Sequence, residues 1–220
     1  MLMVAAAGAF DGHGAQASAS SPHAAKALVP AHPPSATAGA AAARPRGATF
    51  RAVPPAGSCR AVTGASGYVN PVAGDVLIGE RIDQGVDYAG TGTLTAIGAA
   101  RITYVGTSGT GWPGAFIEYR LLDGPDAGCF VYYAEGINPA GGLHAGQTVR
   151  AGQVMATIIP GWSTGIELGW GAGKSTKTYA AKSGKWSATD DADSVASSAG
   201  KSFSALIAGL GGPRGKVEGG

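Results

Sequence analysis

The stretch Asp83-Gln-Gly-Val-Asp-Tyr-Ala89 and the later stretch Thr164-Gly-Ile-Glu-Leu168 are the most informative parts of this chain. They belong to two short strand-like runs, Asp83–Tyr88 and Thr164–Trp170, which glycine-rich turns separate from their neighbours. Further runs of this kind lie at Thr93–Ile97, Arg101–Val105, Ala115–Leu122, Cys129–Ala134 and Val154–Ile159. With 38 glycines and only 14% charged residues, the composition favours turn-dense β structure.

The run Ala115–Leu122 has the clearest period. One face carries Ile117, Tyr119 and Leu121, and the other carries Phe116, Glu118 and Arg120, as in a half-solvated strand. The loop at 122–128 predicts a hairpin that leads into Cys129–Ala134. The predicted fold class is therefore mainly β, a glycine-rich β-sandwich or barrel.

The chain after residue 170 has a different composition. Residues 171–190 are rich in Gly, Ser, Thr and Lys, which is typical of a loop. The apolar positions Val195, Phe203, Leu206, Ile207 and Leu210 predict one helix between Asp193 and Leu210. An Asp at 190–193 is expected to cap it, and Gly211-Gly212-Pro213 to end it. We expect 171–220 to form a loop and a helix packed on the β domain.

The N-terminal residues predict export. Residues 1–17 are small and apolar and end in Ala15-Gln16-Ala17, the form of a signal-peptidase site. The positive n-region is missing, so we interpret this as a truncated signal peptide; a disordered Ala-rich leader is the alternative. Residues 18–57 have the composition of an Ala/Pro-rich disordered linker, which places the β domain at 58–170. The expected location is secreted or cell-envelope, without a membrane span.

Cys59 and Cys129 fit this location as one disulfide that closes a loop of 70 residues. Two free buried thiols are the alternative.

The charge distribution argues against nucleic acid as a partner. Residues 61–170 contain four arginines, no lysine and nine acidic residues, so this region would repel phosphates. The basic flanks would either touch anionic wall polymers or remain solvated tails.

Four landmarks, in order, resemble the lysostaphin-type (LytM) metallopeptidases, whose β-sandwich is called the duplicated hybrid motif. They are Asp83–Ala89, similar to His-x-Gly-x-Asp-Φ-Ala; Leu94–Thr103, similar to the following hairpin; His144–Val154, similar to repeated Gly-Gln-x-Val turns; and Thr164–Leu168, in the place of Thr-Gly-x-x-x-His-Leu-His-Phe. The closest likeness is to a divergent, actinobacterial-looking branch with the motif found here at Glu80–Asp87.

The resemblance implies where a metal site would lie. Active members hold zinc with the His and Asp of the first motif and the second His of His-x-His. Carried over by position, these ligand places fall on Asp83, Asp87 and Glu167, and the helper places fall on Gly165 and Glu135. Only Asp87 keeps the residue type that the family uses.

The histidine count argues against zinc catalysis. Of the four histidines, His13, His23 and His32 precede the β domain, and only His144 lies within it, on a predicted turn. Zinc prefers imidazole and thiolate ligands, and a hydrolytic site also needs an open water position. We therefore assign no catalytic residue.

Two arrangements remain open for the carboxylates of Asp83, Asp87, Glu135 and Glu167, which would converge if the family geometry is kept. Clustered like charges need a positive neighbour. Either Arg81 or Arg101 supplies it through a salt bridge, or a divalent cation binds at Asp83, Asp87 and Glu167. That cation would be calcium or magnesium, and manganese would also fit. If the protein is an active enzyme, the cation would be zinc. Paired carboxylates also occur in glycoside hydrolases.

Aromatic residues beside glycine-rich turns indicate a sugar-binding groove with Trp112, Trp170 and Tyr133 as candidates, although core packing is the alternative for each. The leading hypothesis is a secreted, catalytically degenerate peptidase-like domain. It would bind peptidoglycan or another wall glycan, or position a wall hydrolase. The competing hypothesis is an active metal-dependent peptidoglycan endopeptidase with a carboxylate-rich site.

Overall fold

We describe the protein from a computed structural model, which covers residues 59, 67–173, 176–184, 186 and 195–217. The predicted signal peptide at 1–17 and the predicted linker at 18–57 lie outside the described residues. No helix in the described part of the chain has the length and apolar character needed to cross a membrane.

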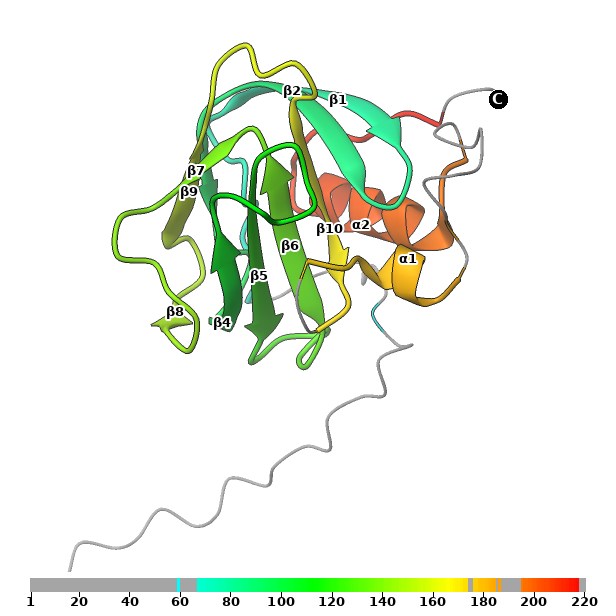
Figure 1. The fold of residues 1–220 in the computed structure, drawn as a ribbon. Coiled ribbons are helices and arrows are strands. Elements are labelled where there is room, and N and C mark those ends of the chain that lie inside the picture. The colour runs from blue at the N-terminus through cyan, green and yellow to red at the C-terminus, as the bar shows by residue number, and fades with distance from the viewer. Residues whose placement is uncertain (1–58, 60–66, 174–175, 185, 187–194, 218–220) are drawn as a thin grey trace, which may run out of the picture. The chain divides into compact units, whose positions relative to one another are not determined.

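Among the described residues, two antiparallel sheets make up the fold (Figure 1). The larger has the strand order β1-β2-β10-β6-β5-β4-β8, and the smaller has the order β3-β9-β7. The strands are β1 Val76–Ile82, β2 Val86–Thr91, β3 Thr93–Thr95, β4 Ala100–Gly106, β5 Ala115–Leu121, β6 Phe130–Glu135, β7 Ile137–Pro139, β8 Thr148–Val149, β9 Val154–Ile158 and β10 Ile166–Gly171. Two helices follow, α1 Tyr179–Lys182 and α2 Ser198–Gly209. The predicted mainly β class with a C-terminal helix is confirmed.

The two faces of the larger sheet have different surroundings. In β10, Ile166, Leu168 and Trp170 are buried in the main core, so Glu167 points to the opposite face because strand side chains alternate. The helix α2 packs against β10 on the core side, where Phe203 meets Trp170 edge to face at 5.2 Å between ring centroids (Figure 1). The opposite face is free to carry polar side chains.

The start of α2 differs from the sequence-based prediction. Its N-cap is Ser197 rather than an Asp at 190–193, and the Ser197 hydroxyl accepts a hydrogen bond from the Gly200 backbone N–H at 3.0 Å. The Ser197 backbone N–H also donates to the Asp83 carbonyl oxygen at 2.8 Å. Val195 precedes the helix and is exposed, whereas Phe203 and Ile207 are buried as predicted. A contact with a distant turn, which the local sequence does not encode, therefore sets where the helix begins.

The first hairpin of the larger sheet also differs from the prediction. The sequence placed a strand at Asp83–Tyr88, but residues 83–85 form the turn between β1 and β2. Strand β1 went unpredicted because two of its apolar side chains, Val76 and Ile78, are exposed and Gly79 interrupts the run. The C-terminal segment pairs with β1 through hydrogen bonds between the backbones of Lys216 and Ile82 and of Lys216 and Glu80. The short helix α1 lies in the predicted loop.

Cys59 and Cys129 form a disulfide, which confirms the predicted pairing and joins the segment before β1 to the start of β6. His144 lies exposed in the turn between β7 and β8, with its Nδ1 2.8 Å from the Gly142 carbonyl oxygen.

Candidate functional site

The site is built on a cross-strand pair. Asp87 of β2 and Glu167 of β10 are direct partners in the antiparallel register. Because their chain neighbours Val86 and Leu168 are buried in the main core, both carboxylates project from the opposite face of the sheet. Both are enclosed, with 8% of Asp87 and 2% of Glu167 exposed.

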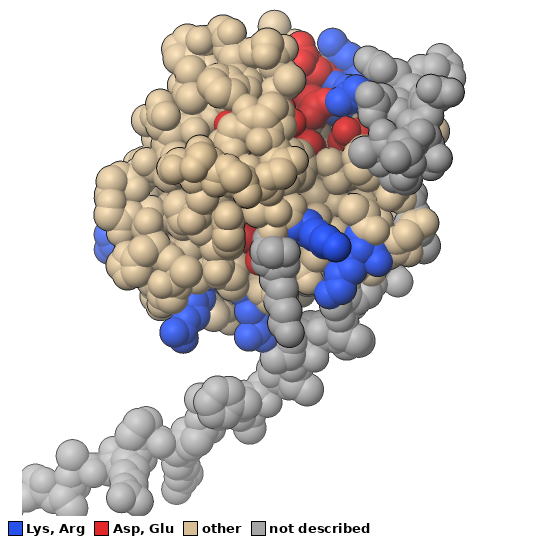
Figure 2. All heavy atoms as spheres, in the orientation of Figure 1, with Lys and Arg blue, Asp and Glu red and all other residues tan. Residues whose placement is uncertain are grey.

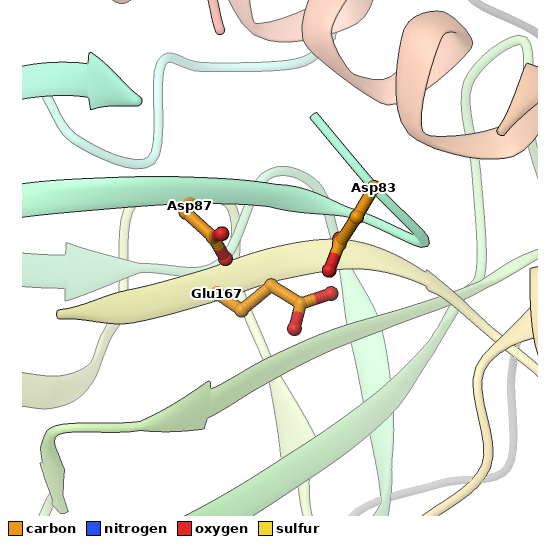
Figure 3. Close-up of side chains that lie close together, drawn as sticks. All are labelled: Asp83, Asp87 and Glu167. Carbon is orange, nitrogen blue, oxygen red and sulfur yellow. The ribbon is translucent and has the colours of Figure 1, made fainter. Parts of the chain in front are cut away.

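Asp83 reaches the same place from the turn between β1 and β2. Its carboxylate accepts a hydrogen bond from the Gly85 backbone N–H at 3.1 Å, which fixes the turn. Residue 85 has to be glycine, because a side chain there would collide with the Tyr132 hydroxyl and the Glu167 carboxylate. Asp83, Asp87 and Glu167 each offer one oxygen within 4.8 Å of the others (Figure 3). We call these three residues the carboxylate cluster.

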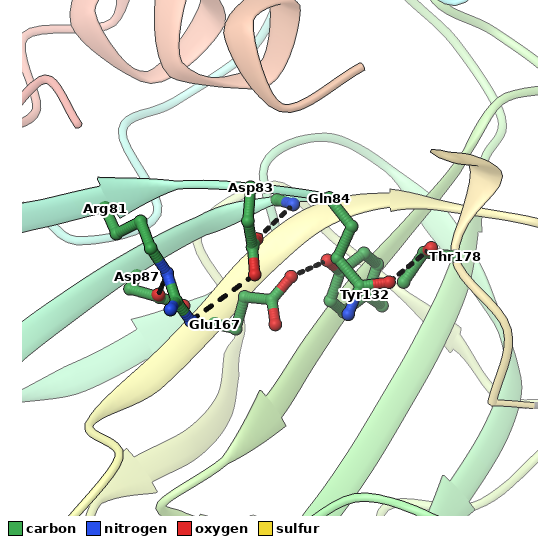
Figure 4. Close-up of polar contacts among 8 residues, drawn as sticks. Arg81, Asp83, Gln84, Asp87, Tyr132, Glu167 and Thr178 are labelled. Carbon is green, nitrogen blue, oxygen red and sulfur yellow. Dashed lines mark hydrogen bonds and ion pairs between the residues drawn. The ribbon is translucent and has the colours of Figure 1, made fainter. Parts of the chain in front are cut away.

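Arg81 provides the positive charge beside the cluster. Its Nε donates to Asp87 Oδ2 at 3.0 Å, and its Nη2 lies 3.5 Å from Asp83 Oδ2 (Figure 4). A guanidinium presents several donors in one plane, so it can serve two carboxylates at once. Of the two arginines that the sequence offered for this role, the structure selects Arg81; Arg101 is exposed on β4.

Tyr132 of β6 contacts the carboxylate cluster and was not predicted from the sequence. Its hydroxyl donates to Glu167 Oε1 (Figure 4), and its ring stacks on Phe116 with 5.4 Å between centroids. The sequence could have indicated it, because side chains alternate between the two faces along the predicted strand Cys129–Ala134. This alternation puts Tyr132 on the face opposite to Tyr133.

The predicted groove aromatics need correction. Trp170 and Tyr133 are 1% and 0% exposed, because they occupy core-facing positions of β10 and β6. Trp112 is partly exposed, but its ring packs on Phe116 and Tyr132 and its Nε1 donates to the Thr176 carbonyl oxygen at 2.9 Å. The candidate groove residues are therefore distributed over both faces of the sheet.

Glu135 lies beside the carboxylate cluster, in a pocket of about 500 Å³. The pocket is open to solvent, and its wall includes Asp87 of the carboxylate cluster and the neighbouring Arg81. Figure 2 shows acidic and basic side chains gathered on this part of the surface, next to β1. The pocket connects the enclosed cluster with the outside.

Burial dominates the electrostatics of the cluster. It raises the pKa of Asp87 to about 7, with the Asp83 charge adding to the rise and Arg81 opposing it. Burial also raises the pKa of Glu167 well above its ordinary value, and the charges of Asp83 and Asp87 add to this. The pKa of Glu135 is raised by burial, while its hydrogen bond with Thr164 opposes the rise.

The residues present do not fit a hydrolytic zinc centre. The cluster offers only carboxylate oxygens, whereas catalytic zinc sites combine any carboxylate with imidazole or thiolate ligands. Oxygen donors suit calcium or magnesium, but Arg81 already lies at hydrogen-bonding distance from Asp87.

A solved structure of lysostaphin is similar to this chain. The NMR solution structure of lysostaphin aligns with a TM-score of 0.37 and 19% sequence identity, covering 49% of this chain and 48% of the lysostaphin chain. This chain therefore spans about half the length of lysostaphin. No family model and no curated protein matches the chain.

The raised pKa of Asp87 predicts that the protein loses stability as the pH rises. The folded-state pKa of about 7 lies above the ordinary value of 3.8, so the folded protein holds this proton more tightly than the unfolded chain. The contribution of this proton to the free energy of unfolding is complete below about pH 4 and is lost as the pH rises through about 7.

Glu167→Gln tests this pH dependence, because the amide keeps an acceptor for Tyr132 and removes one carboxylate. Between about pH 5 and pH 8, its Tm is expected to fall by about 5 °C less than that of the wild type. Thermal melting followed by circular dichroism measures the difference, with the exposed Asp123→Asn as the control. Equal falls in Glu167→Gln and the wild type would contradict the prediction.

Proposed function

We propose that this protein is an exported, non-catalytic domain that binds the bacterial cell wall, and that Arg81 has taken the place of a metal ion in its carboxylate cluster. The observation that supports this most directly is the contact of one guanidinium with both Asp83 and Asp87. A fixed positive charge at this point balances buried carboxylates as a cation would.

The cluster lacks the groups that peptide hydrolysis needs. A metallopeptidase combines metal ligands, an open position for water and a group that moves a proton. Within the described residues, the single histidine is the exposed His144, and Gly165 stands at a helper position of the family motif. Glu167 is enclosed and already accepts a hydrogen bond from Tyr132. These features favour a scaffold that has lost catalysis.

The surroundings of the cluster favour binding. The pocket next to it is polar and open, and the hydroxyls of Ser163 and Thr164 line it together with charged groups. Peptidoglycan presents hydroxyl, amide, amino and carboxylate groups, and the polar residues that line this pocket can form hydrogen bonds with them. The disulfide between Cys59 and Cys129 is compatible with an oxidising location outside the cytoplasm.

Incubation of the full chain with purified sacculi tests this proposal. We expect the protein to sediment with the sacculi and to release no muropeptides, with or without added zinc. Cellulose serves as the control polymer. Failure to sediment, with no wall hydrolase captured in parallel, would overturn wall binding.

The clustering of three carboxylates within 4.8 Å favours a second candidate, a metal-dependent peptidoglycan endopeptidase. That candidate predicts muropeptide release that a chelator abolishes and that both Asp87→Ala and Glu167→Ala destroy. The same digest therefore separates the two functions.

A further inference from the structure

The pocket beside the carboxylate cluster contains charged groups of both signs. Glu80 and Glu135 supply carboxylates that lie outside the cluster, and Lys216 supplies an ammonium. In the part of the chain that the structure describes, the ion pairs are those that Arg81 makes with Asp83 and Asp87. Lys216 is exposed, lines the pocket and takes part in neither of these ion pairs.

Glu135 is held in an unusual backbone conformation. With φ at 75°, it is the one described residue other than glycine in the left-handed region, a conformation that costs roughly 1 kcal/mol or more. Glu135 is the last residue of β6, where it is paired with Ala115 on one side and Ile166 on the other. Gly114 lies so close to the Glu135 carbonyl that no side chain fits there. The carboxylate is thus placed at the pocket wall by rigid surroundings.

Lys216 is placed by the C-terminal segment. Its backbone N–H donates to the Glu80 carbonyl oxygen at 2.5 Å, and its carbonyl oxygen accepts from the Ile82 N–H at 2.8 Å. One residue earlier, the Gly215 N–H donates to the Ser204 hydroxyl of α2 at 3.0 Å. The segment is therefore anchored to both β1 and α2, and it carries the lysine to the pocket.

The lining excludes two classes of ligand. Sugars are commonly held against aromatic faces, yet no aromatic side chain lines this pocket, and Trp112, Trp170 and Tyr133 all lie elsewhere. Phosphates are disfavoured because Glu80, Asp87 and Glu135 outnumber the basic residues of the wall.

We infer that this pocket binds the zwitterionic end of a short peptide, with Glu135 receiving the ligand's ammonium group and Lys216 its carboxylate. Thr164, which lies in the same wall, is hydrogen-bonded to Glu135, and its neighbour Ser163 can hydrogen-bond the amide between the two charges. This inference rests on the proposed wall binding and deepens it, because it assigns the pocket to the peptide part of peptidoglycan and not to the glycan.

Calorimetry with dialanine, N-acetyl-dialanine and dialanine amide tests the pocket, using the full chain. We expect dialanine to bind, and either blocking group to weaken binding by about tenfold, as the loss of one charge-assisted hydrogen bond predicts. In Glu135→Gln, dialanine and its N-acetyl form are expected to bind equally. In Lys216→Met, dialanine and its amide are expected to bind equally. The exposed Lys201→Met on α2 is the matched control and should behave as wild type.

Several results would overturn the assignment. One is that the wild type shows no heat of binding at about 10 mM dialanine. Another is that the wild type binds the free and the blocked peptides equally. A third is that Glu135→Gln and Lys216→Met both still distinguish free from blocked peptides as the wild type does. Equal melting curves for the variants and the control show that a loss of discrimination is not a loss of folding. Sacculus binding without dialanine binding overturns the pocket assignment and leaves the wall-binding proposal standing. Dialanine binding without sacculus binding overturns the wall-binding proposal alone.

Discussion

Arg81→Met is expected to lower the free energy of unfolding by about 3 kcal/mol at neutral pH. The guanidinium is in contact with Asp83 and Asp87, whose side chains are only 5% and 11% exposed. Removing it takes a positive charge away from both carboxylates in a site that desolvates them. The methionine keeps most of the apolar length of the side chain, so the change isolates the charge. Urea unfolding followed by circular dichroism measures the loss.

The same variant is expected to gain a response to divalent cations. Without Arg81, the three carboxylate oxygens of the cluster form an oxygen-rich site that suits calcium, magnesium or manganese. Because a ligand that binds only the folded state stabilises it, millimolar calcium is expected to raise the Tm of Arg81→Met by several degrees and that of the wild type by less than about 1 °C.

Arg101→Met provides the matched control, because Arg101 is exposed on β4 and makes no ion pair with a described residue. It should change stability by less than about 0.5 kcal/mol and gain no cation response. The opposite outcome is that calcium strongly raises the Tm of the wild type and raises that of Arg81→Met by no more. In that case the cluster would hold a cation in addition to the arginine. That outcome would favour the metal-dependent candidate.

Replacing both Cys59 and Cys129 by alanine is expected to lower the free energy of unfolding by about 4 kcal/mol. The disulfide closes a loop of 70 residues, and the loss of that constraint increases the conformational entropy of the unfolded chain. The loop spans β1 to β5 and ends next to β6, which carries Tyr132 and Glu135. The double variant should therefore lose wall binding only at denaturant concentrations at which it begins to unfold.

Guanidinium titrations of the double variant and of the reduced wild type measure this effect. The two should agree, since both remove the same link. A loss below about 1 kcal/mol in both would show that the unfolded chain is already restricted near these residues or that the bond strains the folded state.

The strand pattern was readable because it depends on local features. The alternation in Ala115–Leu122 predicted a strand, and the structure has β5 at Ala115–Leu121 with Ile117 and Tyr119 in the core. The prediction that its other face is solvated was wrong, because Phe116 and Glu118 are buried as well. The same reasoning failed for β1, whose side chains at Val76 and Ile78 face solvent. It also misplaced the N-cap of α2, since Ser197 is selected partly by its contact with Asp83.

The order of residues alone determined a glycine-rich β domain with a C-terminal helix. These follow from composition and hydrophobic period, which are local properties. Only the tertiary structure decided which side chains meet. Arg81, Asp83 and Asp87 come from one hairpin, but Glu167 and Tyr132 come from strands far along the chain. Their charges balance only because the antiparallel registers of β2, β10 and β6 place them side by side in a buried site, where each unpaired charge would be costly.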